Sequence, residues 1–506
     1  MRFQHTIEMK NTIFRHIYTL FILVVAFTAA SCENVGKSKC SIFTSPSHVY
    51  SSSQQTVVIE YVVGATASEP QPIRVSATPD CDWITNINNH KLGELRIDIA
   101  ENSGEQRTAT IEIACKDVKK PVYVEITQLA SSNVDSYKHA LIFYFFGTSL
   151  DRYFGYNIED ASTAISQDIL KQNRVLYVRQ LSSSKAKICE LSYNPIDKCT
   201  IDTTLKTIDI DSKKITSQDI CNTLNLIDKY VSADRYGIVL AGHGRGWVPI
   251  ESEDDDITSF SLSGNMWTPA IGAETTRHFG ENNTLVEISE LAAGIESSNL
   301  NVDYLLFDAC FMSNIESLYE LRNTANYIIA SPCEIMGRGF PYHRVLPHLF
   351  ANDGKSSDIM GAAESYYLYY RDEYTGAARC GSVAVIDCRE IDALAEATGS
   401  VVATAISEYD TSTLQTYEGQ SNHIFYDFGE WCSTVATDQN ALDVFNKQYN
   451  RTVIAKYTLP TFYSAFGSYG TYPINEEVYS GVTTSAPSSV YPNDWINTEW
   501  YKRVWK

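Results

Sequence analysis

The chain has no cysteine pattern of the kind that holds a metal ion. Its twelve cysteines are scattered over 506 residues, and no two are separated by only two residues, so nothing predicts a zinc site. Disulfide bonds stay open as an expectation, because Cys81 could pair with Cys115 and Cys189 with Cys199.

Positive charge is also scarce. The chain carries 40 Lys and Arg against 61 Asp and Glu, a net charge of −21, and such a surface repels phosphate backbones. We therefore expect no nucleic-acid partner. With 44% hydrophobic and 20% charged residues the composition is that of a globular protein, and the length predicts two or three domains.

Long apolar runs are missing. The longest early run, "LFILVVAF", is short for a bilayer-spanning helix, and it follows Lys10 and Arg15 and ends in "TAAS" before Cys32. This layout predicts a secretory signal, with Met9 as an alternative start. Small residues before cysteine resemble the bacterial lipobox, although Ala29 stands where leucine is commonest. We expect an exported lipoprotein, anchored through lipidated Cys32 at the outer membrane or cell surface; an ordinary cleaved signal is the alternative.

Short alternating segments follow the leader. Stretches such as "QTVVIEYVV", "ELRIDIA" and "TATIEIAC" alternate with a period of two, which predicts a small all-β sandwich over residues 45–131. The segment resembles the BACON domain, an immunoglobulin-like module of Bacteroidetes, through Trp83, Asn102, Arg107 and Gln128. That resemblance implies glycan binding or, alternatively, a stalk with Trp83 as its core tryptophan.

Beyond residue 132 apolar runs alternate with helical patterns, which predicts an α/β fold with a mostly parallel sheet flanked by helices. Two residues with side chains that can act in catalysis directly follow such runs: His243 in "YGIVLAGHG" and Cys310 in "VDYLLFDAC". Ligands collect at the carboxyl ends of parallel strands, so we expect the two residues to act together.

A cysteine becomes a nucleophile as a thiolate, and a nearby imidazole can take its proton and later return it to the leaving group. The backbone amides of Gly244 and Cys310 are candidate donors to a developing oxyanion. Taken singly, a His or a Cys at a strand end is more often a structural residue than a catalytic one; their joint placement favours a cysteine nucleophile.

The two motifs, "GIVLAGHGRGW" and "VDYLLFDACFMSNIESLYELRNTANYIIAS", resemble those of the clostripain-like cysteine peptidases, and the similarity runs from about residue 135 to the terminus. It implies a caspase-like fold, a His243–Cys310 dyad and endopeptidase cleavage after Arg or Lys, without a cofactor for the chemistry. Asp308 matches a position associated with the pocket for the basic side chain. A strand-end carboxylate that bonds loop amides is the alternative for Asp308.

After "YIIAS" the chain departs from its relatives and reads "PCEIMGRGFPY". Glu334 is expected to add negative charge to the substrate-binding pocket, and Phe340 to form a wall of the cleft. Cys333 and Arg338 are unexpected beside a pocket for cations. Arg338 could neutralise Asp308, which would weaken a preference for basic residues.

Residues 248–300 read as an exposed polar loop between the two motifs. Relatives are often cut in this region, and Arg277 is its only Lys or Arg, so we expect self-processing between Arg277 and His278. The run "ESEDDD" could bind a structural calcium ion, but it lacks the spacing of an EF-hand loop and also fits a solvated acidic loop.

The sequence thus predicts five regions. They are a signal peptide (1–31), a tether (32–44), the BACON-like sandwich (45–131), the catalytic domain (132–390) and the C-terminal part of the peptidase region (391–506). The expected substrates are proteins or peptides. Two other functions stay open: a glycan-binding adhesion lipoprotein on an inactive caspase-like scaffold, and an enzyme for non-protein amides.

Overall fold

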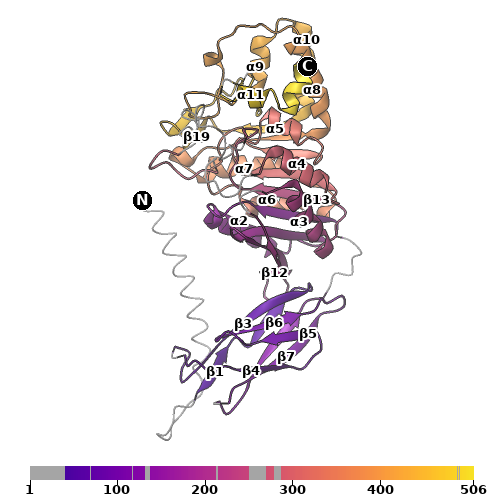
Figure 1. Cartoon of the computed structure of the whole chain (residues 1–506), viewed down its shortest axis with the longest axis vertical. Coiled ribbons are helices and arrows are strands. Elements are labelled where there is room, and N and C mark those ends of the chain that lie inside the picture. Colours follow the sequence, from indigo (N-terminus) through magenta and orange to yellow (C-terminus); the bar gives the residue numbers. More distant parts are fainter. Residues whose placement is uncertain are drawn as a thin grey trace.

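The computed structural model describes residues 40–506, apart from residues 69, 117, 131–136, 212–214, 250–268, 278–285, 487 and 489. Cys32 and the acidic run at 251–256 therefore lie outside the described residues. Figure 1 shows an N-terminal β-sandwich (residues 41–128) beside a larger α/β body (residues 137–506).

The β-sandwich consists of two four-stranded sheets around one apolar core. Alternate residues of its strands are buried, as in β7, because successive side chains of a strand point to opposite faces. Its first strand begins at Ser41, inside the region expected to be a tether. One sheet contains β1 (Ser41–Thr44), β3 (Gln55–Gly64), β6 (Glu94–Ile99) and β5 (Ile84–Asn88); the other contains β2 (Ser47–Tyr50), β8 (Val122–Gln128), β7 (Arg107–Ala114) and β4 (Ser76–Pro79).

Four side chains singled out in the sequence hold the sandwich together internally. The guanidinium of Arg107 lies 4.6 Å from the ring centroid of Trp83, and its Nε donates to Oε1 of Gln128 at 2.9 Å. Asn102 donates through Nδ2 to the carbonyl of Leu129 at 2.8 Å. Trp83 is only 8% exposed, so it packs as a core residue under Arg107.

A nine-stranded sheet forms the centre of the α/β body. Its order is β12-β11-β10-β9-β13-β14-β15-β16-β18. The strands are β9 (His139–Phe145), β10 (Asn173–Ser182), β11 (Lys185–Asn194), β12 (Cys199–Asp209), β13 (Tyr236–Ala241), β14 (Val302–Asp308), β15 (Tyr327–Ala330), β16 (Ser382–Asp387) and β18 (Val453–Thr458).

The sheet is mixed, which corrects the expectation of a mostly parallel one. The five central strands, β10 to β15 in the order above, pair in parallel, whereas β11, β12, β16 and β18 pair antiparallel at the two sides. Short turns join β10, β11 and β12, and a strand that returns through a short turn must run antiparallel. β12 reaches the sandwich and contacts β2 and β3.

The helices form two groups of neighbours. The chain passes from β9 through α2 to β10 on one side, and from β13 through α4 and α5 to β15 on the other. Since crossovers between parallel strands are right-handed, the two groups cover opposite faces. One group is α2 (Asp151–Ile165), α6 (Tyr342–Leu349) and α7 (Ile359–Glu373); the other is α3 (Ser217–Tyr230), α4 (Ile288–Glu296), α5 (Ile315–Glu320), α12 (Glu499–Val504), α8 (Ile391–Val402) and α10 (Gln439–Thr452).

Residues after 390 belong to the same core as the central strands. They supply the edge strand β18, the hairpin of β19 (Thr461–Ser464) with β20 (Gly470–Pro473), and the small pairing of β17 (Tyr426–Asp427) with β21 (Thr483–Thr484). The remaining helices are α9 (Phe428–Val435) and α11 (Pro492–Trp495).

Neither suggested disulfide is present. All eleven cysteines among the described residues are free. In the β11–β12 register Cys189 lies opposite Thr204, whereas Cys199 lies opposite Asn194 at the other end of the hairpin, so the two thiols cannot meet. Across the described part of the chain, no helix is long and apolar enough to cross a bilayer.

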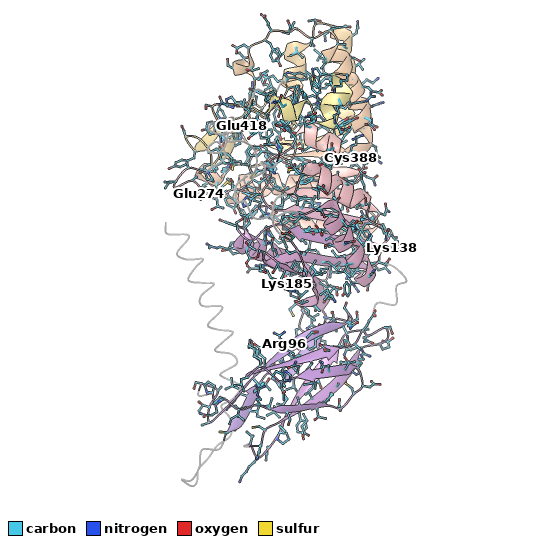
Figure 2. The ribbon with its side chains drawn as sticks, viewed as in Figure 1. Arg96, Lys138, Lys185, Glu274, Cys388 and Glu418 are labelled. Carbon is cyan, nitrogen blue, oxygen red and sulfur yellow. The ribbon has the colours of Figure 1, made fainter. Side chains whose placement is uncertain are left out.

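We predict that Arg107→Ala lowers the free energy of unfolding of the sandwich by about 2 kcal/mol, because Gln128 and Trp83 lose a part-buried partner. Urea unfolding followed by circular dichroism measures the change. Arg96→Ala is the matched control, since Arg96, labelled in Figure 2, lies on β6 of the other sheet and its side chain is 57% exposed. Equal effects of the two substitutions would contradict the prediction.

Candidate active site

His243 and Cys310 follow adjacent parallel strands at equivalent positions. In the register of β13 and β14, Ala241 lies opposite Asp308, so His243 and Cys310 each come two residues beyond a paired position. His243 follows β13, which lies next to β9 where the direction of successive crossovers reverses, the usual location of a ligand site in an open α/β sheet, and Cys310 follows the next strand, β14.

Gly244 brings the two motifs into contact. A Cβ atom built on Gly244 would lie 2.2 Å from the carbonyl oxygen of Cys310 and 2.7 Å from its amide nitrogen. No side chain fits there, so glycine is required for this close approach of two backbones.

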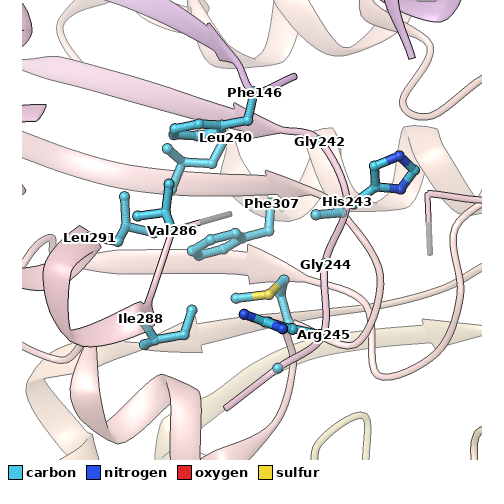
Figure 3. Close-up of a pocket in the computed structure, with 13 residues that line it drawn as sticks. Phe146, Leu240, Gly242, His243, Gly244, Arg245, Val286, Ile288, Leu291 and Phe307 are labelled. Atoms are coloured by element: carbon cyan, nitrogen blue, oxygen red, sulfur yellow. The ribbon is translucent and has the colours of Figure 1, made fainter. Parts of the chain in front are cut away.

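The imidazole and an apolar cavity lie on opposite sides of this loop. Figure 3 shows the ring of His243 pointing away from Leu240 and Phe307. The cavity measures about 60 Å3 and reaches Ile288 and Leu291 of α4. The ring instead approaches the loop after β9, where Nε2 of His243 and Oγ of Ser149 are 2.8 Å apart.

Segment 269–277 pairs with the chain that follows β15, next to Cys310. Thr276 and Met336 form an antiparallel bridge, the amide of Arg277 donates to the carbonyl of Ile335 at 2.7 Å, and the amide of Gly337 donates to the carbonyl of Thr275 at 2.7 Å. An extended peptide bound to a strand edge makes this same pattern of main-chain bonds.

The carbonyl of Arg277 meets both amides that the sequence marked as oxyanion donors. Its oxygen accepts from the amide of Gly244 at 3.1 Å and from the amide of Cys310 at 3.4 Å. The peptide carbonyl at the end of the 269–277 segment is therefore held by backbone donors beside the Cys310 thiol.

The side chain of Arg277 fills a closed pocket with Asp308 at its end. The two groups lie 3.2 Å apart from Nη1 to Oδ2, and both side chains are fully buried. Tyr342 donates to the same carboxylate oxygen at 2.8 Å, and the amide of Phe340 at 3.3 Å. Burial raises the pKa of the Asp308 carboxyl, and the Arg277 guanidinium opposes that rise.

Arg338 does not occupy this pocket. Its Nη2 lies 2.7 Å from Oδ1 of Asp160 on α2, and its guanidinium lies 4.8 Å from the ring centroid of Tyr156. The suggestion that Arg338 neutralises Asp308 is therefore wrong. Arg277 pairs with Asp308, and Arg338 pairs with Asp160.

Glu334 contacts the residue before Arg277. Its Oε2 accepts from the hydroxyl of Thr276 at 2.5 Å, and its Oε1 accepts from the hydroxyl of Ser464 at 2.6 Å. Burial raises the pKa of Glu334 to about 7. The ring of Phe340, in contrast, is fully buried, and its centroid lies 4.3 Å from the ring centroid of Tyr366. Phe340 therefore contacts the pocket through its backbone amide.

The surroundings of the Cys310 thiol favour its protonated form. Burial raises its pKa well above the ordinary value and the charge of Glu334 raises it further, while the amide of Ile335, which donates to Sγ at 3.1 Å, opposes both. The filled site thus keeps the thiol in its less nucleophilic form.

Several contacts came from residues that the sequence did not single out. Asn157, Tyr342 and Ser464 lie on α2, α6 and β19, and Ser149 lies in the turn before α2; none belongs to a motif with fixed spacing from His243 or Cys310. Among the described residues, no three His, Cys, Asp or Glu side chains are grouped to hold a metal ion.

Comparison with known proteins gives the family. A model of the clostripain family matches residues 196–491. A secreted C11 cysteine protease of Bacteroides thetaiotaomicron, "iotapain", is 30% identical, with a TM-score of 0.63 over 73% of this chain and 100% of that one. An inactive zymogen C11 protease of Parabacteroides distasonis is 26% identical, with a TM-score of 0.60 over 74% of this chain and 100% of that one.

A third structure shares the fold at 24% identity. It is a secreted C11 cysteine protease of Bacteroides thetaiotaomicron in complex with an irreversible peptide inhibitor, with a TM-score of 0.60 over 72% of this chain and 98% of that one. A comparison with curated proteins found no match. The family model covers more than half of the chain, so this chain belongs to the clostripain family and is a cysteine peptidase.

Proposed function

We propose that the protein is an exported cysteine endopeptidase that cleaves after arginine or lysine with a His243–Cys310 dyad. One observation carries this proposal: the chain presents its own Arg277 as a bound substrate would lie. The carbonyl of Arg277 is held by the amides of Gly244 and Cys310, and its guanidinium is paired with Asp308. Backbone amides therefore bind the main chain of Arg277, and Asp308 binds its side chain.

The reaction follows from this geometry. His243 takes the thiol proton, and Sγ of Cys310 attacks the carbonyl carbon of the arginine, so that negative charge develops on the oxygen held by the two amides. The imidazolium then gives its proton to the leaving amine as the carbon–nitrogen bond breaks. Water, activated by the same imidazole, hydrolyses the thioester. Ser149 holds the imidazole of His243 through Nε2.

Asp308 selects the basic side chain because it is a buried carboxylate at the end of a closed pocket. Any cation-free residue in that pocket would leave the carboxylate without an opposite charge, at a cost of about 3 kcal/mol or more. Glu334 adds a second contact, to the residue before the arginine, through the Thr276 hydroxyl.

Self-processing between Arg277 and His278 follows from the same placement. Arg277 is the only Lys or Arg between Arg245 and Arg322, so an enzyme of this specificity finds one candidate bond between its two motifs. The antiparallel pairing of 275–277 with 335–337, and the bond from the Cys310 amide to the Arg277 carbonyl, support this assignment.

The leader and the sandwich fit export and display at a membrane. Relatives are described as secreted C11 proteases. We propose lipidation at Cys32, with the BACON-like, immunoglobulin-like sandwich as a spacer. The spacer role is favoured over glycan binding because Trp83 is buried under Arg107 and offers no exposed ring to a sugar. A structural calcium ion at 251–256 stays a separate proposal.

The dyad predicts that Cys310→Ala and His243→Ala each lower kcat/KM for a fluorogenic peptide ending in arginine by at least about a thousandfold. Cys432→Ala, which removes another buried thiol on α9, is the matched control and should keep the wild-type rate. Activity of the Cys310→Ala variant would rule out the proposed nucleophile.

For self-processing, we predict that intact mass of the incubated protein shows a break between Arg277 and His278, and that Arg277→Ala abolishes it. Arg322→Gln removes the next basic residue along the chain and should leave the break unchanged. A break elsewhere in 248–300, or one that survives Arg277→Ala, would contradict the assignment.

The Glu334 contact predicts that Thr276→Val slows self-cleavage about tenfold, because the buried carboxylate loses a hydrogen-bond donor of unchanged shape. Thr275→Val is the control, since Thr275 is exposed whereas neighbouring Thr276 is fully buried. The time course of the cut fragments on a denaturing gel gives both rates. Equal rates for the two variants would show that the contact between Glu334 and the Thr276 side chain does not contribute to self-cleavage.

A further inference from the structure

The guanidinium of Arg277 is bonded on every side, and one of its partners lies outside both motifs. Its Nη1 donates to the carbonyl oxygen of Asp308 at 3.1 Å, and its Nε donates to the carbonyl of Gly337 at 3.3 Å. Its Nη2 donates to Oδ1 of Asn157 at 2.7 Å and to the carbonyl of Arg338 at 3.4 Å. The bond to Asn157 is the shortest of these hydrogen bonds.

Asn157 is held in position for this contact. It lies in the middle of α2 and is fully buried. Its Nδ2 donates to the carbonyl of Arg338 at 3.1 Å, which turns Oδ1 toward the guanidinium. Asp160, one turn further along α2, pairs with Arg338 and so fixes the same loop.

The backbone at Gly339 leaves no spare room beside the ion pair. A Cβ atom built on Gly339 would lie 2.4 Å from Nη2 of Arg277 and 2.4 Å from Oδ1 of Asp308. The backbone of Gly339 thus lies directly against the ion pair, and the pocket accepts a flat group bonded along its edges.

We propose that Asn157 is a specificity-determining residue that makes the pocket select arginine over lysine. The inference rests on the proposed cleavage after a basic residue and deepens it. Asp308 alone pairs with either cation, because both carry one positive charge. A lysine ammonium is a single donor centre on a flexible stem, and it cannot reach Asp308, Asn157 and the Gly337 carbonyl together. Lysine therefore leaves the buried Oδ1 of Asn157 without its donor, and a site built for a hydrogen-bonding group rejects a ligand that lacks it.

The test compares two fluorogenic peptides that share the residues before Arg277, Ala-Glu-Thr-Thr-Arg and Ala-Glu-Thr-Thr-Lys. Both are measured on the same preparation of full-length protein, so that the ratio of their kcat/KM values does not depend on the fraction activated. A variant that fails to cut itself is first incubated with immobilised wild-type enzyme, which is then removed.

The wild-type enzyme should prefer the arginine peptide by about a hundredfold or more. Asn157→Ala should lower kcat/KM for arginine by about ten- to a hundredfold and change the lysine value by less than about threefold, so the preference collapses. Glu159→Ala alters an exposed neighbour on α2 and should leave the ratio unchanged. Thermal unfolding of both variants reports whether α2 remains folded.

Three results would overturn the inference. The arginine and lysine rates could fall by the same factor in Asn157→Ala, which would make Asn157 a structural residue only. The wild-type enzyme could cleave both peptides equally, which would show that the pocket selects a positive charge without distinguishing arginine from lysine. Cleavage of neutral peptides with neither basic peptide cleaved would instead remove the proposed function itself, and the inference with it.

Discussion

The buried ion pair between Arg277 and Asp308 is the interaction on which the rest of the site depends. Moving two opposite charges out of water costs several kcal/mol per ion, and the pair is stable only when further hydrogen bonds satisfy both groups. Here Tyr342 and the amide of Phe340 donate hydrogen bonds to the carboxylate. Asn157 and three backbone carbonyls accept hydrogen bonds from the guanidinium. The pair thus fixes the loop at 337–340, helix α2 and the end of β14 in one arrangement.

The central sheet positions the loops that carry His243 and Cys310 next to this ion pair. Because β13 and β14 are parallel and in register, their exit loops present His243 and Cys310 at the same level, and Gly244 lets the two backbones approach closely. The same loops place two amide donors against the carbonyl of Arg277. A shift of one residue in the register would turn the side chains of β14 to the opposite face, and Asp308 would then no longer face Arg277.

Local motifs located the residues of this core well, whereas contacts between distant segments could not be read from them. His243, Cys310, Gly244 and Arg277 were proposed from strand ends, glycine placement and the scarcity of basic residues in one loop, and Asp308 from the resemblance to the clostripain-like peptidases. Asn157 contacts a residue 120 positions away in the chain, and nothing in the helical pattern of α2 marks it. The partner of Arg338 and the antiparallel edges of the sheet were missed for the same reason, since both depend on tertiary packing rather than on local pattern.

The contacts that recognise Arg277 also restrain the enzyme. While segment 269–277 fills the site, the Cys310 thiol is fully buried, and both burial and Glu334 hold its pKa high. Under the proposed function, a cut after Arg277 would leave the segment covalently attached to the strand that carries His243, because no other Lys or Arg lies between Arg245 and Arg277. A tethered ligand competes at a high effective concentration. The depth of the arginine pocket therefore acts in two directions: every contact that strengthens recognition of a substrate also slows the departure of the chain's own segment.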